Sequence, residues 1–220
     1  MSVWNMGLSL FQVWCCAAVS GTKYCVTKAV EQFKPDIKPH RAQYVAKNIV
    51  KSACLMLMAP FACIGLYNVM KYDSWSNVLF KSCGAMYSAN DIVGLVTMRL
   101  PLSTRLHHSC VAIMSMLSIW YIDYAHPSLV RGFGVLGAFS AITAPVNLYL
   151  GVRLLGSFPH LRKTSLVIYG ASTVLSAGWQ SQHIMSMALH THPLMVVAYT
   201  SLIAVVYYDD MILLSFLCKE

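Results

Sequence analysis

Long runs of apolar residues, separated by shorter polar segments, extend along most of the chain. A helix that crosses a bilayer needs roughly 20 predominantly apolar residues, and the runs approach or reach this length. Lipid cannot satisfy the hydrogen bonds of an open strand edge, so the runs predict helices. We expect an all-α, polytopic transmembrane bundle of about seven helices. The runs lie at about residues 3–20, 45–70, 77–99, 107–124, 132–152, 165–188 and 194–217.

Composition separates this chain from soluble proteins. Of its 220 residues, 57% are hydrophobic and 11% are charged, whereas a soluble domain carries about a quarter charged residues. The formal net charge of +8 does not indicate nucleic-acid binding here, because basic residues crowd the loops on one side of a membrane protein. The eight cysteines lack the paired short spacing of a zinc site. We expect no metal site, no cofactor and no disulfide framework.

The distribution of basic residues predicts an orientation. Most of them flank the odd-to-even helix connections or the C-terminus, which places the N-terminus outside and the C-terminus in the cytosol or an equivalent compartment. The loop after the first helix is the most basic, and Pro35 and Pro39 predict that it is extended. The division into units is then residues 1–44, a first helix with its inner loop, and residues 45–217, a six-helix domain. The basic residues of this face are Lys23, Lys28, Lys34, Lys38, Arg41, Lys47, Lys51, Arg99, Arg105, Arg153, Arg162, Lys163 and Lys219.

A second group of polar residues lies inside the apolar runs, where each ionisable side chain is a candidate for function. Helix rise places them within roughly 12 Å of the inner boundary on four different helices. They predict a polar pocket near the inner leaflet. The residues are Asp91, His107, His108, Asn147, Asp209 and Asp210.

Structural interpretations of the same residues remain open. The histidines could lie in the headgroup region, and because neighbours on a helix point about 100° apart, at most one of them is expected to face a pocket squarely. Asn147 is typical of a helix–helix contact. Asp91 could bond a neighbouring helix, and Asp209 and Asp210 could reach water. His183 lies in the outer half and is interpreted as a hydrogen-bonded interior residue.

One segment carries a motif, which indicates a particular protein family more specifically than composition does. Tyr87 and Asp91 are four residues apart, hence on one helix face, and the short connection Pro101-Leu-Ser-Thr-Arg-Leu106 leads from that helix to the pair His107-His108. This arrangement resembles the TLC domain (TRAM, Lag1 and CLN8 homology) over roughly residues 45–217. Lys47-Asn-Ile-Val-Lys-Ser52 resembles the start of that domain, and Ala141-Ile-Thr-Ala-Pro-Val-Asn147 resembles the Ser-Thr-Pro…Asn segment of its TLCD branch.

The departures from that pattern bear on activity. The ceramide synthases of the family carry an Asp-x-x-Asp-type motif on the helix after the histidine pair, and residues 132–152 contain no acid. The TLCD branch has a glutamate before its Ser-Thr-Pro element, where this chain has Ala138, Ser140 or Ala141. Since residues 141–147 resemble the TLCD segment and the acidic motif is missing, the chain resembles the TLCD branch more than the ceramide synthases.

Three functions follow from this resemblance. The first is lipid binding or lipid homeostasis without enzymatic activity, with Tyr87, Asp91, His107, His108, Asn147, Asp209 and Asp210 lining the lipid site. The second is a structural accessory subunit of a larger membrane complex, for example a respiratory assembly, with other membrane subunits as partners. The third is an N-acyltransferase that uses acyl-CoA as substrate, in which His107, His108 and Asp91 would be catalytic. The basic pattern fits the endoplasmic reticulum and the mitochondrial inner membrane equally.

Overall fold

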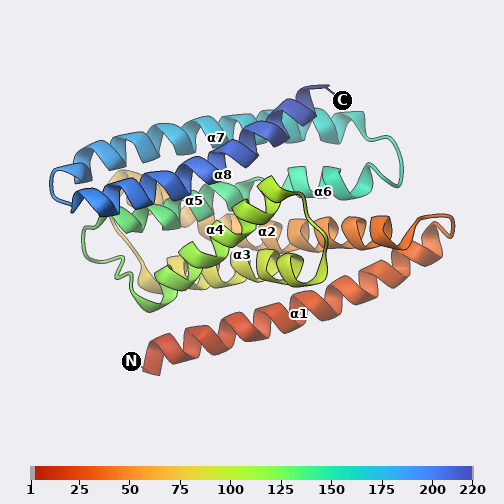
Figure 1. The fold of residues 1–220 in the computed structure, drawn as a ribbon, viewed down its shortest axis with the longest axis horizontal. Coiled ribbons are helices and arrows are strands. Elements are labelled where there is room, and N and C mark those ends of the chain that lie inside the picture. Colours follow the sequence, from red (N-terminus) through yellow and green to blue (C-terminus); the bar gives the residue numbers. More distant parts are fainter. Residues whose placement is uncertain (1–2, 220) are drawn as a thin grey trace.

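The computed structural model describes residues 3–219. Within that stretch the chain forms eight α-helices, one 3₁₀ turn and no strand (Figure 1). The all-helical prediction is confirmed. The elements are α1 (Val3–Phe33), α2 (Pro39–Tyr72), α3 (Asn77–Thr97), α4 (Leu102–Trp120), the 3₁₀ turn η1 (Leu129–Arg131), α5 (Gly132–Ile142), α6 (Ala144–Val152), α7 (Pro159–Ala188) and α8 (Pro193–Lys219).

Two or three of these helices are apolar enough to cross a membrane. Helices α2 and α8 each meet this condition by length and hydropathy. The segment that joins η1, α5 and α6 meets it as one span bent by 47°. The chain is therefore compatible with an integral membrane protein.

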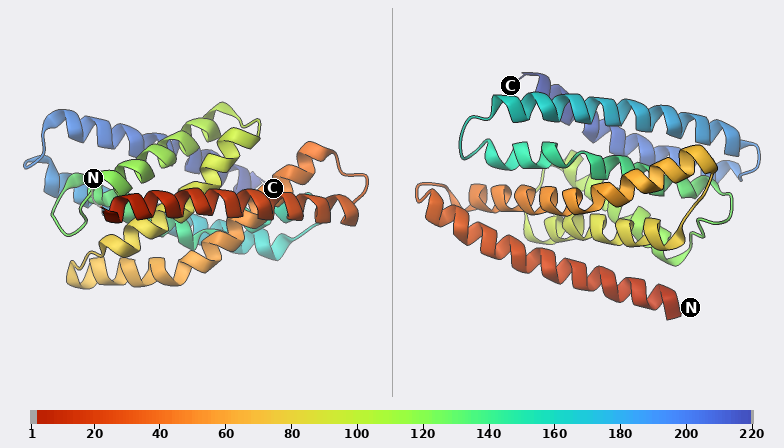
Figure 2. Two further views of the ribbon diagram at one scale, coloured as in Figure 1. Left: turned by 90° about the horizontal axis from the view of Figure 1, so that it is seen from below. Right: turned by 180° about the vertical axis from the view of Figure 1, so that it is seen from behind.

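The helices run along the long axis of the molecule. The α1–α2 and α6–α7 connections and the C-terminus lie toward one end, and the α2–α3 and α7–α8 connections lie toward the other (Figure 1). Helix α1 packs on α2 and α3 along one side, while α7 and α8 pair on the opposite side (Figure 2). The basic α1–α2 connection is thus at the same end as the C-terminus.

The loop after the first helix is shorter than predicted. Helix α1 continues to Phe33, and α2 already begins at Pro39, so only residues 34–38 connect them. Lys38 has the extended backbone expected before a proline (φ −64°, ψ 139°). Pro39, however, occupies the first turn of α2 rather than the loop. Its fixed φ and missing N–H are tolerated there, because first-turn N–H groups have no partner within the helix.

The fifth predicted helix, 132–152, is broken at Thr143. Pro145 lies in the first turn of α6, and a proline removes one helical hydrogen bond and crowds the carbonyl four residues earlier. Side chains of other helices hydrogen-bond the backbone just after the break, in the first turn of α6. Ser52 of α2 donates to the carbonyl of Ala144 (2.8 Å), and Ser165 of α7 donates to that of Pro145 (2.9 Å).

Helix α7 turns its polar side toward the other helices. Ser172 donates to the carbonyl of Phe139, and Gln180 donates to that of Gly132. Large apolar residues such as Val167, Val174 and Met185 are exposed on its other face, and polar side chains at a helix interface are typical of proteins in lipid. The buried residues of α7 are Ser165, Tyr169, Ser172, Ser176, Gln180 and His183.

Candidate functional site

A polar cavity of about 390 Å³ lies among α2 to α8, with α3 contributing Tyr87. Six of the seven sequence-predicted site residues line it: Tyr87, His107, His108, Asn147, Asp209 and Asp210. Leu100 and Pro101 of the α3–α4 connection also line it, with Ser103 and Thr104 in the first turn of α4 and Arg153 just after α6. The seventh predicted residue, Asp91, is fully buried behind the wall and contacts two residues that line the cavity.

Asp91 is the centre of the charged cluster. Its Oδ1 accepts a hydrogen bond from Lys51 Nζ at 2.5 Å and lies 2.8 Å from His108 Nδ1. Lys51 Nζ also lies 5.1 Å from the centre of the Tyr87 ring. Tyr87 and Asp91 therefore do share one helix face, and a single lysine contacts both. Buried charges of this kind are tolerated only when they are paired and hydrogen-bonded.

Both histidines line the cavity. Their ring centres are 5.5 Å apart and their planes are at 87°. His107 Nδ1 lies 3.5 Å from Asp209 Oδ2 on α8, while His108 turns toward Asp91 on α3. Adjacent side chains diverge on a helix, but the cavity extends around the start of α4 and contacts each of them.

The two acids of α8 have different partners, as their adjacent positions predict. Asp209 faces His107, whereas Asp210 Oδ1 accepts a 2.6 Å hydrogen bond from the Tyr169 hydroxyl of α7. Both are half-buried and line the cavity, as does Asn147. His183, by contrast, bonds the carbonyl of Leu129 (3.0 Å) and stacks on Trp179, so its interpretation as an interior hydrogen-bonded residue is confirmed.

The sequence interpretation missed two lysines of this site. The sequence pattern places Lys47 and Lys51 with the basic residues of the inner face, but both are buried in α2 and line the cavity. Lys47 Nζ lies 3.2 Å from His108 Nε2. Their spacing of four residues at the start of an apolar run was the available signal, because it places both on one helix face. Tyr169 was also missed, and nothing in its local sequence marks it.

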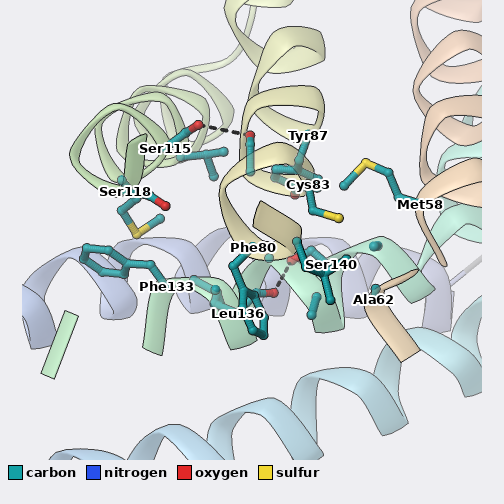
Figure 3. Close-up of a pocket in the computed structure, with 18 of the residues that line it drawn as sticks. Met58, Ala62, Phe80, Cys83, Tyr87, Ser115, Ser118, Phe133, Leu136 and Ser140 are labelled. Atoms are coloured by element: carbon teal, nitrogen blue, oxygen red, sulfur yellow. Dashed lines mark hydrogen bonds between the residues drawn. The ribbon is translucent and has the colours of Figure 1, made fainter. Parts of the chain in front are cut away.

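A second, apolar cavity of about 60 Å³ adjoins the polar one. Figure 3 shows Met58, Phe80, Cys83 and Phe133 around it, on α2, α3 and α5. Its hydroxyl groups are paired with one another or with backbone carbonyls, which leaves a largely apolar lining (Figure 3). Ser140 donates to the carbonyl of Leu136 (3.0 Å), and the hydroxyl groups of Ser118 and Tyr124 bond each other (2.8 Å). Tyr87, Leu136 and Ser140 line both cavities, so the two spaces meet at these three residues.

The cluster also has donor atoms spaced for a metal ion. One donor atom each from Asp91, His107 and His108 lies within 4.8 Å of the others. Lys51 and Lys47, however, place amino groups against Asp91 Oδ1 and His108 Nε2. A divalent cation there would meet these groups at short range in a region of weak screening. We therefore assign no metal to this cluster.

Comparisons of the chain with models of protein families, with curated proteins and with solved structures find no match. The residues that carry the TLC resemblance are nonetheless gathered in one place. Tyr87, Asp91, His107 and His108 all belong to the connected cluster around Lys51.

Proposed function

We propose that the chain is a TLC-like integral membrane protein that binds an amphipathic lipid, with a role in lipid homeostasis. The observation that carries the proposal is the junction of the polar and apolar cavities at Tyr87, Leu136 and Ser140. A lipid has the same two parts, a polar headgroup and an apolar chain. Ligand sites typically combine an apolar lining with a few convergent polar groups.

The polar cavity supplies both donors and acceptors for a headgroup. Lys47 and Lys51 reach it from α2, and Asp209 and Asp210 reach it from α8. A headgroup in this cavity would be held by charged groups that are shielded from water, where such interactions are stronger than at a surface. The apolar cavity would take the first part of the chain.

The proposed membrane arrangement has seven spans, with α5 and α6 together forming the fifth. Two observations support it. Residues 129–142 and 144–152 together are long and apolar enough to cross as one span with a bend of 47°. In addition, the connections that follow the first and the fifth span lie toward one end, and those that follow the second and the sixth lie toward the other (Figure 1). The positive-inside rule then places the N-terminus outside. The polar cavity would lie in the inner half, beside the α3–α4 connection.

An N-acyltransferase is the second candidate. It is favoured by the 2.8 Å approach of His108 Nδ1 to Asp91, because an imidazole oriented by a carboxylate is a common general base. In that role His108 would deprotonate an amine, and acyl-CoA would be the acyl donor.

Quantification of lipid extracted from the purified protein tests the proposal. We expect a defined lipid in the wild-type chain and much less in His107→Ala/His108→Ala. The double variant His126→Ala/His160→Ala, at exposed positions outside the cavity, should retain it. Equal lipid in both variants would contradict the proposed site. Formation of labelled amide from acyl-CoA and a long-chain amine would instead favour the acyltransferase.

A further inference from the structure

Lys47 is a buried lysine without a carboxylate partner. Its side chain is 8% exposed, and its Nζ forms its closest polar contact with His108 Nε2 at 3.2 Å. Among residues 3–219 no ion pair joins Lys47 to an acid; the neighbouring Asp91 is paired with Lys51. Gly94 of α3 makes room for this side chain, because a Cβ there would lie 3.3 Å from Lys47 Cε.

The charged groups around Lys47 come from its own helix and from three others. Lys51 lies one turn further along α2, Lys23 belongs to α1, Asp91 to α3 and Asp209 to α8. A lysine that is removed from water and stands next to another cation is the arrangement that activates nucleophilic lysines. Buried lysines are correspondingly the ones that serve as bases or form Schiff bases in proteins.

We propose that Lys47 is a nucleophilic amine that binds an amphipathic aldehyde or ketone covalently as an imine, with His108 as its proton acceptor. This inference rests on the proposed lipid site, because the ligand occupies the same polar cavity. Lys47 and His108 both line that cavity, so the carbonyl carbon of a ligand there can reach the amine.

The reaction is balanced without a further reagent. His108 Nε2 takes a proton from the Lys47 ammonium group, and the free amine attacks the carbonyl carbon to form a C–N bond. After proton transfer to the oxygen the adduct is a carbinolamine. The imidazolium then returns its proton to the hydroxyl group, the C–O bond breaks, and water leaves into the cavity. The product is a protonated imine on Lys47 and a neutral His108.

Lys81 is a matched control within the same chain. It is equally buried (7% exposed) and bonds a neutral acceptor, but that acceptor is the backbone carbonyl of Ile119 (3.2 Å) rather than an imidazole. Lys81 also lies outside the polar cavity. A difference in reactivity between the two lysines therefore reports on the cavity and His108 and not on burial alone.

Reductive trapping tests the proposal. The full chain in detergent is incubated with hexadecanal and cyanoborohydride, and modified lysines are located by mass spectrometry. We expect Lys47 to be alkylated at least about tenfold faster than Lys81. His108→Gln should slow the alkylation of Lys47 by at least about tenfold as well, because a general base typically contributes about a hundredfold or more to a rate. Equal rates at the two lysines, or a Lys47 rate that His108→Gln leaves unchanged, would overturn the proposal.

A small aldehyde tests the reactivity of the Lys47 amine independently of lipid binding. Reductive methylation with formaldehyde needs no apolar chain site, so fast methylation of Lys47 would support the activated amine even if no lipid is bound. The opposite result has two parts: bound lipid is extracted completely without reductant, and Lys47 reacts no faster than Lys81. That result would support the lipid site and refute the imine.

Discussion

Lys51 of α2 and Asp91 of α3 form a buried ion pair of 2.5 Å across 40 residues of sequence. The two side chains are 7% and 0% exposed. The pair fixes α2 against α3 at the depth of the polar cavity, and it holds the carboxylate beside His108. Arrangement of the site and stability of the fold are therefore coupled at this contact.

Removal of one partner should destabilise the protein strongly. Lys51→Met leaves the buried Asp91 carboxylate with His108 as its remaining close partner, and breaking a buried pair in this way costs roughly 3–5 kcal/mol. Lys51→Met/Asp91→Leu should recover most of the loss. Thermal unfolding in detergent measures both. The exposed pair Lys28–Glu31 is the control, and Lys28→Met should change stability much less, because a surface ion pair contributes little. Equal effects of the two lysine substitutions would contradict the buried pair.

Filling the apolar cavity should weaken binding of long-chain ligands. Gly137 lines that cavity, and a Cβ at this position meets no atom within 4 Å. Gly137→Leu should therefore fold normally but reduce the amount of co-purified lipid by at least about tenfold, which corresponds to about 1.4 kcal/mol. Gly178→Leu on α7, where a Cβ is equally unobstructed, should leave the lipid content unchanged. A similar lipid content in both variants would show that the chain does not occupy this cavity.

The inward polar side of α7 should contribute measurably to stability. Gln180 donates to the carbonyl of Gly132 and accepts from the Tyr199 hydroxyl. Gln180→Leu leaves both groups unpaired and should cost about 1–3 kcal/mol. Ser181→Ala, which removes an exposed hydroxyl bonded within its own helix, should change stability by at most about 0.5 kcal/mol. Chemical unfolding in mixed micelles compares them, and a neutral Gln180→Leu would argue against these bonds.

Much of this arrangement is predictable from the sequence. Apolar runs predict the helices because lipid excludes other backbone structures, and the position of Asp91, His107 and His108 in those runs predicts a polar cluster. The length of α1 was not predictable from hydropathy, because its last turns around Lys28 are polar but helical. The place of Lys47 and Lys51 in the site was not predictable, because a lysine near a helix end is equally typical of an anchor at the membrane interface. Only the packing of the helices buries these two side chains.

The membrane orientation is testable with cysteines. The proposed topology places Cys218 inside and the α2–α3 connection, which contains the exposed Ser74, outside. In a background where the exposed Cys25 and Cys63 are serine, an impermeant thiol reagent should label Ser74→Cys from the outer side. Cys218 should react only after the membrane is opened. Labelling of both from one side would refute an odd number of spans.

Native mass spectrometry of the full chain, extracted from its own membrane in gentle detergent, tests directly whether the two cavities hold a lipid. We expect one adduct of lipid mass per chain, which is lost in Asp91→Asn and in Gly137→Leu but retained in Gly178→Leu. A stoichiometric set of protein partners without a lipid adduct, unaffected by these substitutions, would contradict it. That result would instead identify the chain as an accessory subunit of a larger membrane complex.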